Sequence, residues 1–442
     1  MNGPYIYDLS TTPIHDKSTE SYEYHKFFPT QNSDLNTYST FRIVINARDQ
    51  LYHIHEAYIE ATGQLVKEVD DTEYGETDGI AFIHNAFPFM FRNFTYKING
   101  QIVDSIDYPG HVSTLFNNVM FSSNKQYESG LQYFWSPDTT SKADASNKGW
   151  EIRRKMLLVE PTKKGIFKFK IPIKNIFGFG ENVKVITKVN HEFEITRQEN
   201  YYSLFRGNVV SSENHTALPN VETAEGKIKL KDFVLWIPVV KPEGTTKIHM
   251  KESELSSKDE YIIAYRQRKG LMVEVPNAIT TWTWGLTTIN FKERPQYLFM
   301  GFQHNNYIDQ KSNYALFKHM DVKNMCVIIN DQQFPAMIAD ADFANLDVGN
   351  FYMALQNVRS NYLQMDPYIN ECGINLIRFK NLTTIFAFDL TKHERDIRGD
   401  VVTARLQVNF AKPTPTNLKA YACLINEKEI FLKSDGGNVV IR

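Results

Sequence analysis

The 442-residue sequence predicts an all-β fold of two tandem jelly-roll (β-sandwich) domains with a few short helices. It contains 30 Phe and 23 Tyr residues, types that suit the half-buried surface of a pleated sheet. Each half of the chain also holds about eight short strand-like segments with long polar connections, a pattern typical of jelly rolls. Finally, residues 92–101 resemble residues 323–332, about half the chain length away.

The composition is that of a folded protein without a strong net charge. Apolar residues make up 42%, and Gly and Pro number only 22 and 17, which excludes collagen-like and largely disordered chains. Lys plus Arg (49) nearly balance Asp plus Glu (51), so no overall field would gather nucleic acid or anionic lipid. Cys326, Cys372 and Cys423 are too widely spaced for a disulfide framework or a metal knuckle, which favours folding in a reducing compartment.

The sequence also lacks recognisable targeting signals. The first residues contain no basic region followed by an apolar one, and Asn2 stands where myristoylation requires glycine. The longest near-apolar stretches, such as residues 81–91, are shorter than the roughly 18 residues of a membrane-spanning helix. We therefore expect a protein that is neither secreted nor lipidated and does not span a bilayer.

Residues 1–38 are predicted to form an extended amino-terminal arm, because they lack sustained periodicity. They carry two lysines and five carboxylates, a net charge of −3, whereas a tail that neutralises DNA needs many Lys or Arg residues. Tyr and Phe recur along the arm, and aromatic side chains are enriched at protein interfaces. We expect the arm to contact neighbouring subunits rather than DNA.

The first half of the chain continues with a series of strands and one helix. Strands are predicted at residues 41–45, 51–69, 94–98 and 101–106. Asn99-Gly100 supplies the two positive φ angles of a type I′ turn, so the last two strands form a tight hairpin. Apolar residues at helical spacing over residues 112–120 then predict an amphipathic helix of about three turns.

Polar stretches set the remaining limits of the first domain. Residues 136–149 are rich in Ser, Asp and Lys and predict a surface loop. Further strands are predicted at residues 154–159, 165–173 and 183–195, after which residues 206–226 break the pattern. The predicted organisation is an arm (1–38), a first jelly roll (39–205), a linker (206–226), a second jelly roll (227–432) and a carboxy-terminal tail (433–442).

An internal repeat predicts that the two domains arose by duplication. Residues 92–101 align without gaps on residues 323–332, at an offset of 231. In the second half a helical stripe again follows the hairpin, through Phe351, Leu355 and Val358, with Asn350 placed to cap it. The turns Asn99-Gly100 and Asn330-Asp331 should then occupy equivalent positions. The alternative is two unrelated β-domains with similar hairpins.

Candidate metal sites among the histidines do not satisfy known spacings. His55-Glu56, His191-Glu192 and His393-Glu394 are each followed by Ile where a zinc protease has its second His. His53 and His55 would share one face of a strand, with Glu60 further on, as in a cupin-type site. Ala47 stands where the leading cupin glycine belongs, and no second histidine motif follows. We interpret these histidines as lining a partly exposed strand or an interface, and we predict no metal, cofactor or catalytic residue.

Other candidate motifs are equally incomplete. Gly178-Phe179-Gly180 lacks the third glycine of a dinucleotide fold, and neither a nucleophile elbow nor a phosphate loop occurs. The acidic residues 68–78 lack the ligand order of an EF-hand and predict a solvated loop. One lysine face could touch nucleic acid or simply be solvated; it consists of Lys164, Lys168, Lys170 and Lys174.

Several segments, in order, resemble the double jelly-roll major capsid proteins of Polintons (Mavericks) and their adintovirus-like relatives. The similarity covers about residues 40–430. The segments that carry it are Tyr108-Pro109-Gly110, Gly149 to Arg154, Leu316 to His319, the hairpin Cys326 to Phe334, Phe386 to Thr391 and Val401 to Phe410.

The resemblance implies a structural, non-enzymatic protein of the virion, assembled in the host cytoplasm or nucleus. It implies homotrimers that act as hexon-like, pseudo-hexameric capsomers and tile an icosahedral shell around double-stranded DNA, without sequence-specific DNA binding. Its partners would be its own copies, neighbouring capsomers and a single jelly-roll penton (vertex) protein, while contact with a membrane stays open. The alternative hypotheses are a two-domain jelly-roll protein that binds carbohydrate and a cupin-type metal enzyme.

Overall fold

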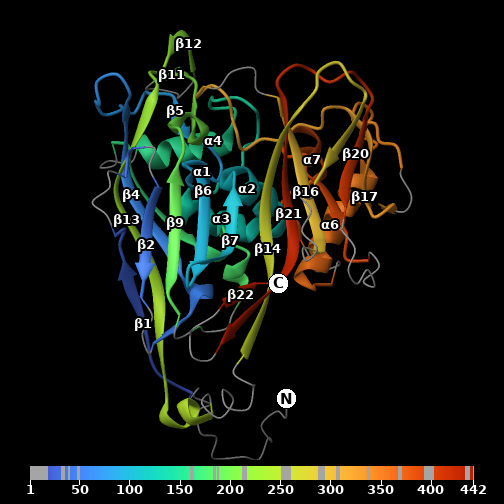
Figure 1. Ribbon diagram of the computed structural model, residues 1–442. Helices are drawn as coiled ribbons and strands as arrows, with labels where there is room; N and C mark the ends of the chain where they lie inside the picture. The colour runs from blue at the N-terminus through green and yellow to red at the C-terminus, as the bar shows by residue number, and fades with distance from the viewer. Residues whose placement is uncertain are drawn as a thin grey trace, which may run out of the picture.

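Two β-sandwiches lie side by side in the computed structural model, with their long strands running in roughly the same direction (Figure 1). The structure describes residues 18–30, 35–37, 40–46, 50–159, 164–182, 186, 189–211, 217–249, 260–286, 294–304, 309–335, 339–366, 371–392, 403–433 and 439–441. Within these residues, no helix combines the length and the hydrophobicity needed to cross a membrane.

The first sandwich consists of two antiparallel sheets. One sheet has the order β1 (Thr19–Phe27), β13 (Gly226–Pro242), β4 (Tyr58–Lys67) and β8 (Ile166–Pro172), with the short β3 (Leu51–Tyr52) beside β13. The facing sheet has the order β2 (Thr40–Ile45), β9 (His191–Arg197), β6 (Phe91–Ile98) and β7 (Gln101–Asp107).

The second sandwich has the same construction. One sheet has the order β14 (Glu260–Val275), β21 (Leu418–Lys433), β16 (Arg294–His304) and β19 (Phe386–Asp389), with β22 (Val439–Ile441) beside β21. The facing sheet has the order β15 (Thr281–Gly285), β20 (Ala404–Phe410), β17 (Val322–Ile329) and β18 (Gln332–Phe334).

The principal strands of each sandwich follow one topology. Counted along the chain, the first, eighth, third and sixth strands form one sheet, and the second, seventh, fourth and fifth form the other. This is the jelly-roll arrangement, so the predicted fold class is confirmed. The strands β1 and β14 are therefore equivalent, as are the hairpins β6–β7 and β17–β18.

Both hairpin turns have the predicted backbone conformation. Asn99 and Gly100 have φ angles of 47° and 80°, and Asn330 and Asp331 have 43° and 67°. Two successive positive φ angles define the type I′ turn, whose twist matches that of the flanking strands. The repeated segment thus forms the fourth and fifth strands of each sandwich, which confirms the predicted equivalence of their positions.

Helices and small sheets occupy the connections. The helices are α1 (Ala86–Phe89), α2 (Pro109–Met120), α3 (Ser123–Tyr133), α4 (Lys148–Arg154), the π-helix η2 (Lys155–Val159), α6 (Gly349–Leu363) and α7 (Leu376–Asn381). Short 3₁₀ turns are η1 (Ile54–Glu56), η3 (Ile173–Asn175), η4 (Phe179–Glu181) and η5 (Asn200–Ser203). Two strand pairs are β5 (Ile80–Phe82) with β10 (Leu204–Arg206) and β11 (Asn208–Val210) with β12 (Ala217–Glu222).

Two segments lie in different parts of the fold from those predicted. Residues 19–27 of the predicted arm form β1, which pairs with β13 over its whole length. Most β1 side chains are exposed, so no apolar alternation marked the strand in the sequence. Residues 227–242, assigned to the second jelly roll, belong to β13 at the centre of the first one, between β1 and β4. Of the predicted linker, residues 207–211 and 217–225 belong to a connection within the first sandwich, where part of them forms β11 and β12.

Some local predictions also require correction. The strand predicted at residues 154–159 is helical, because Asn147 caps α4 by accepting a hydrogen bond from the Trp150 amide (3.3 Å) and the π-helix η2 continues it. The strand predicted at 51–69 is interrupted by η1, and β9 begins only at His191. Helix α6 is present, but Val348 and not Asn350 occupies its amino-terminal capping position.

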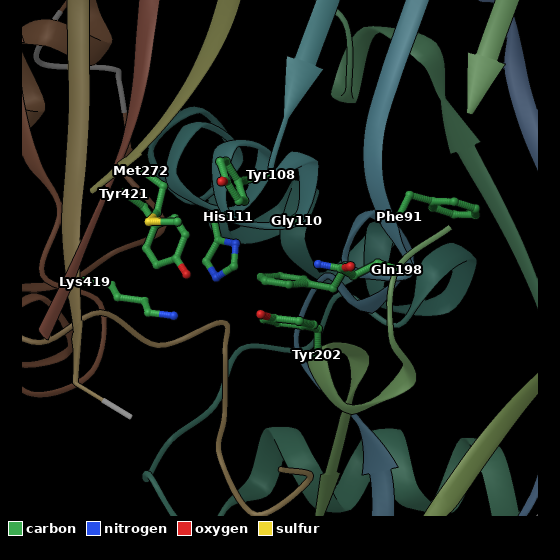
Figure 2. Close-up of a pocket in the computed structure, with 10 residues that line it drawn as sticks. Phe91, Tyr108, Gly110, His111, Gln198, Tyr202, Met272, Lys419 and Tyr421 are labelled. Atoms are coloured by element: carbon green, nitrogen blue, oxygen red, sulfur yellow. The ribbon is translucent and has the colours of Figure 1, made fainter. Parts of the chain in front are cut away.

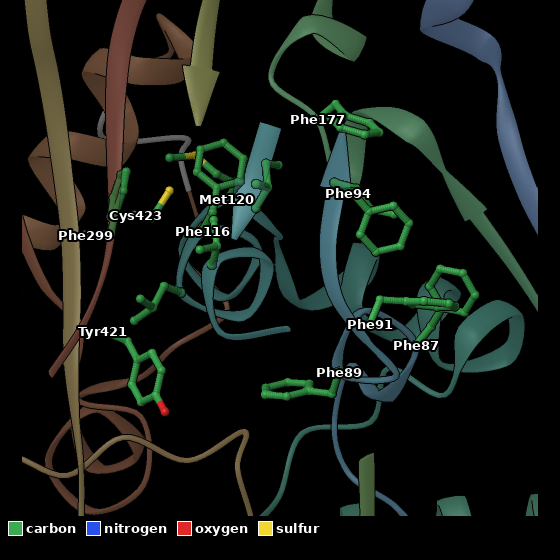
Figure 3. Packing of buried hydrophobic residues seen from close by; sticks show 14 of the residues in the cluster. Phe87, Phe89, Phe91, Phe94, Phe116, Met120, Phe177, Phe299, Tyr421 and Cys423 are labelled. Atoms are coloured by element: carbon green, nitrogen blue, oxygen red, sulfur yellow. The ribbon is translucent and has the colours of Figure 1, made fainter. Parts of the chain in front are cut away.

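A continuous hydrophobic core joins the two sandwiches. Figure 3 shows aromatic side chains from the first sandwich, including Phe87 and Phe94, followed by Phe116 of α2 and then Phe299 and Cys423 of the second sandwich. These residues are almost fully buried. Because close-packed interiors resist deformation, the two sandwiches should behave as one rigid body.

Candidate functional site

The contact between the two sandwiches, which we call the joint, contains a connected group of polar and aromatic side chains. Helix α2, strand β7 and the turn η4 of the first sandwich contact β14, β21 and β16 of the second, and α6 contacts α2. Figure 1 shows α2 in the middle of the molecule, between the two sets of strands. Every residue of α2 is buried, so this helix is a core element of both sandwiches.

The local sequence explains why α2 forms at this place. Pro109 occupies its first turn, where its fixed φ suits a helix and its missing N–H costs nothing. The hydroxyls of Ser113 and Thr114 donate to the carbonyls of Pro109 and Gly110 (2.6 Å each), so neither buried hydroxyl lacks a partner. Both hydroxyls beside the apolar stripe predicted over residues 112–120 are therefore satisfied within the helix.

His111 attaches the start of α2 to the second sandwich. Its ring stacks on Tyr421 of β21 (Figure 2). Its Nε2 lies 3.1 Å from Oε1 of Gln303 on β16. Burial lowers the pKa of His111 to about 3, so the imidazole is neutral at physiological pH. The contact is an uncharged stacking and hydrogen-bonding interaction.

The middle of α2 contacts an arginine of β14. The Arg268 guanidinium lies 3.8 Å from the centroid of the Phe116 ring, and Phe116 also packs edge-on against Phe299 of β16. Arg268 forms an ion pair with Glu181 of η4, which in turn accepts a hydrogen bond from the Tyr362 hydroxyl of α6 (2.6 Å). One cation thus connects α2, η4 and α6 by cation–π, ionic and hydrogen-bonded contacts.

The carboxy-terminal end of α2 is capped by arginines of the second sandwich. Arg359 of α6 donates from Nε to the Val119 carbonyl (2.8 Å) and from Nη2 to the Met120 carbonyl (3.1 Å). Arg378 of α7 donates to the side-chain oxygen of Asn118 (3.1 Å). The last carbonyls of a helix have no partner within the helix and carry partial negative charge, so Arg359 satisfies two of them, while Arg378 adds positive charge nearby.

Asp104 of β7 is a fully buried carboxylate close to this network. Its Oδ2 accepts a hydrogen bond from the Phe179 amide (3.0 Å), whereas its Oδ1 has no hydrogen-bond partner among the described residues. Burial raises the pKa of Asp104 to about 7, although the Phe179 amide and the nearby Arg268 oppose this shift. The carboxyl group therefore changes charge near neutral pH inside the joint.

Two glycines allow the backbones of the sandwiches to touch. A Cβ atom at Gly270 of β14 would lie 1.9 Å from the Asp107 carbonyl oxygen, and one at Gly178 would lie 1.8 Å from the Arg266 carbonyl oxygen. Neither approach leaves room for a side chain. The Gly178-Phe179-Gly180 motif therefore serves close packing at the joint.

A small cavity and a shallower one are lined by described residues. The one beside His111 and Tyr421 has a volume of about 40 Å³, which accommodates at most a few water molecules (Figure 2). A shallower one of about 320 Å³ lies between the loop at 141–144 and residues 205–208. Its cations Arg206 and Lys311 both pair with Glu222.

The candidate cupin histidines lie on a 3₁₀ turn and not on a strand. His53 precedes η1 and His55 lies within it; their rings stack 5.9 Å apart. His53 Nδ1 lies 3.0 Å from the Tyr22 hydroxyl, and His55 Nδ1 lies 2.9 Å from the Gly180 carbonyl oxygen. Glu60 pairs instead with Lys168 (3.0 Å) and Lys170 (3.7 Å). Across the described ranges, no three His, Cys, Asp or Glu side chains are grouped as metal ligands would be.

The other sequence candidates have structural contacts where the structure describes them. His191 is buried against the Tyr96 hydroxyl (2.8 Å), and burial lowers its pKa to about 4; His393-Glu394 lies outside the described residues. In the lysine face, Lys164 pairs with Glu73 (3.2 Å) and Lys174 with Glu56 (3.4 Å), in addition to the two lysines at Glu60. Cys326, Cys372 and Cys423 are free thiols.

Two jelly rolls of identical topology, joined within one chain by a shared buried helix, define a double jelly-roll protein. The sequence model of the double jelly roll-like domain family matches residues 80–430. The chain belongs to this family. No curated protein sequence matches the chain.

Solved structures with the same fold come from viruses. A chain of the Sputnik virophage has a TM-score of 0.65 at 11% identity, covering 100% of this chain and 92% of that one. A chain of the PBCV-1 virus capsid has a TM-score of 0.56 at 12% identity, covering 97% and 98%. The mavirus major capsid protein has a TM-score of 0.53 at 9% identity, covering 100% and 95%. At these identities the similarity establishes the fold.

Proposed function

We propose that this chain is a structural, non-enzymatic major capsid protein of a virion, in the Polinton/Maverick and adintovirus-like lineage. Three copies form a pseudo-hexameric capsomer, and capsomers tile an icosahedral shell around double-stranded DNA. The observation that carries the proposal is the joint, because it holds two jelly rolls of the same topology rigidly within one chain. Closed threefold symmetry then presents six comparable blocks from three identical subunits.

Two further observations support this role. The chain shares its fold, over nearly its whole length, with the mavirus major capsid protein and with a chain of the PBCV-1 capsid. The ion pair between the buried Arg268 and Glu181 joins the two sandwiches, and the buried Asp104 accepts a hydrogen bond from the Phe179 amide within the first sandwich. A shell protein requires such rigidity more than it requires reactive groups.

The charge distribution supports enclosure of DNA without sequence-specific binding. The lysine face is neutralised by Glu56, Glu60 and Glu73, which leaves it little excess charge for phosphate contacts. The other expected partners, namely neighbouring capsomers and a single jelly-roll vertex protein, belong to the same proposal.

Particle mass tests the proposal directly. Light scattering of the purified protein at micromolar concentration and physiological salt should give three times the subunit mass of 51.2 kDa, or a larger shell. Electron microscopy of concentrated protein should show six-lobed particles. A protein that stays monomeric under these conditions would contradict the proposal.

A further inference from the structure

A partly exposed aromatic surface lies on the first sandwich, on the sheet formed by β1, β13, β4 and β8. Its members are Tyr22 and Tyr24 of β1, Trp236 of β13 and Tyr58 of β4, and we call it the aromatic face. Tyr22 and Tyr24 are 44% and 43% exposed. Exposed aromatic side chains gathered on one surface typically mark a binding site.

Strand pairing places these side chains on the outer surface of the sheet. Lys26 is paired with Trp236, and Trp236 with Tyr58, so the three share one face. The neighbouring residues of β13 point the other way, since Phe233 packs against Phe41 of the facing sheet (4.8 Å between centroids). The aromatic face therefore points away from the core of the first sandwich.

The rings form one connected group. Tyr22 and Tyr24 lie 6.1 Å apart, Tyr24 and Tyr58 lie 5.7 Å apart, and Tyr58 stacks on Trp236 at 5.9 Å. Lys26 Nζ lies 4.7 Å from the Trp236 ring centroid. Such preformed aromatic surfaces lose little conformational entropy on binding, which suits a protein–protein contact.

The equivalent surface of the second sandwich is already covered within the chain. Phe302 of β16 points into the second sandwich, where its ring centroid lies 5.6 Å from that of Phe410. The adjacent position, Gly301, faces the opposite side of the sheet. Tyr421 of β21 pairs with Gly301 and therefore also points outward. The outward side carries Tyr421 and Phe299, and helix α2 covers both through His111 and Phe116. Helix α2, which follows the hairpin of the first sandwich, thus covers this sheet of the second sandwich.

We propose that the aromatic face binds a second copy of this chain, through the side of its second sandwich that carries α6. Helix α6 is the counterpart of α2, because each follows the repeated hairpin of its sandwich. Within the chain, the side of the first sandwich that carries α2 covers a sheet of the second sandwich. Because the two sandwiches are equivalent, the side that carries α6 should cover the aromatic face of the next subunit in the same way. This inference rests on the proposed trimer and adds the surfaces that form it.

The arrangement of the two surfaces suits a closed ring. Figure 1 shows β1 at one side of the molecule and β17 and α6 at the other, so the contact would run head to tail. Head-to-tail contacts generate rings when the rotation closes. On α6 the exposed apolar residue is Met353, which is 57% exposed.

Substitution of the two exposed tyrosines tests the aromatic face. The double variant Tyr22→Ser/Tyr24→Ser should shift sedimentation from trimer to monomer, with at least tenfold weaker association. The matched control is Tyr127→Ser on α3, because Tyr127 is 78% exposed but lies elsewhere; it should remain trimeric. Circular dichroism and thermal melting should show that all variants fold.

A mixing experiment tests the head-to-tail geometry. Met353→Lys should also be monomeric, because it alters the opposite surface. When it is mixed with Tyr22→Ser/Tyr24→Ser, each pair of chains retains one intact contact, so the mixture should form dimers that do not close into trimers. No dimer in the mixture would overturn the pairing of these two surfaces.

Three other outcomes would overturn the inference, and only the last of them would also contradict the proposed function. If the wild type is trimeric and Tyr22→Ser/Tyr24→Ser is equally trimeric, the capsomer forms through other surfaces and only the inference fails. If the same variant remains trimeric but loses binding to an oligosaccharide array, the aromatic face recognises glycans. A monomeric wild type would contradict both the inference and the proposed function.

Discussion

The imidazole of His111 and the phenol ring of Tyr421 lie parallel, with centroids 3.7 Å apart and 1° between their planes. The two residues belong to different sandwiches, so this stacking contact is part of what makes the chain one rigid body. Because burial keeps His111 neutral, the contact does not depend on pH over the physiological range.

We expect His111→Ala to destabilise the protein by about 2–4 kcal/mol, since it leaves a cavity and deprives the buried Gln303 side chain of a partner. Urea unfolding monitored by fluorescence measures this loss. Tyr421→Phe retains the stacked ring and should change the free energy of unfolding by no more than about 0.5 kcal/mol. Equal losses in both variants would show that the stacking is not the stabilising interaction.

Gly270→Ala should be among the most destabilising single-methyl changes in the chain. The new Cβ would lie 1.9 Å from the Asp107 carbonyl oxygen, so the sandwiches would have to separate. We expect a loss of about 2 kcal/mol or more in unfolding free energy. Gly285→Ala on β15 is the control, because no atom lies within 4 Å of its added Cβ. An unchanged melting temperature for Gly270→Ala would argue against this close contact.

Asp104 should make stability depend on pH. Its pKa is about 7 in the folded protein and near 3.8 when unfolded, so the folded state binds the proton more tightly. Its contribution to stability is complete below about pH 4 and is lost as pH rises through 7. Relative to Asp104→Asn, the wild type should lose on the order of 1–3 kcal/mol between pH 5 and pH 8. Parallel stability curves for the two proteins over this range would refute the assignment.

Gly100→Val should strain the first hairpin turn. Gly100 has φ +80° and no atom within 4 Å of an added Cβ, so the penalty comes from the backbone alone. A β-branched residue at positive φ should cost about 1–3 kcal/mol in unfolding free energy. Gly100→Asn is the control, because Asn tolerates this conformation, as Asp331 does at the equivalent turn with φ 67°. Calorimetry of the two variants measures the difference.

Features that depend on local chemistry could be predicted from the sequence. The Asn99-Gly100 turn and helix α2 follow from turn residues and from apolar spacing, and the repeat correctly related the two hairpins. Strand β1 escaped prediction because its exposed residues show no alternation, and its place in the sheet depends on pairing with β13, more than 200 residues away.

The joint could not be predicted because its members come together only in the folded chain. Asp104, Glu181 and Arg268 lie far apart in the sequence and in unlike local contexts. The available signals were Gly178 and Gly270, each a glycine beside or within a β-segment, where close backbone approach is one common reason for its presence. Neither glycine indicates which backbone it would meet.

The last prediction concerns the amino-terminal arm, whose first 17 residues lie outside the described structure. Because the arm is acidic overall, it should promote assembly through protein contacts and should not bind DNA. Deleting residues 2–17 keeps β1 and the aromatic face, so the truncated protein should still form trimers yet assemble shells poorly.

Deleting residues 2–30 also removes β1, which should abolish the trimer itself. Light scattering and electron microscopy separate these two effects, and DNA retention at increasing salt should be unchanged by the shorter deletion. If that deletion instead abolished DNA binding and left empty shells intact, the arm would be a packaging element.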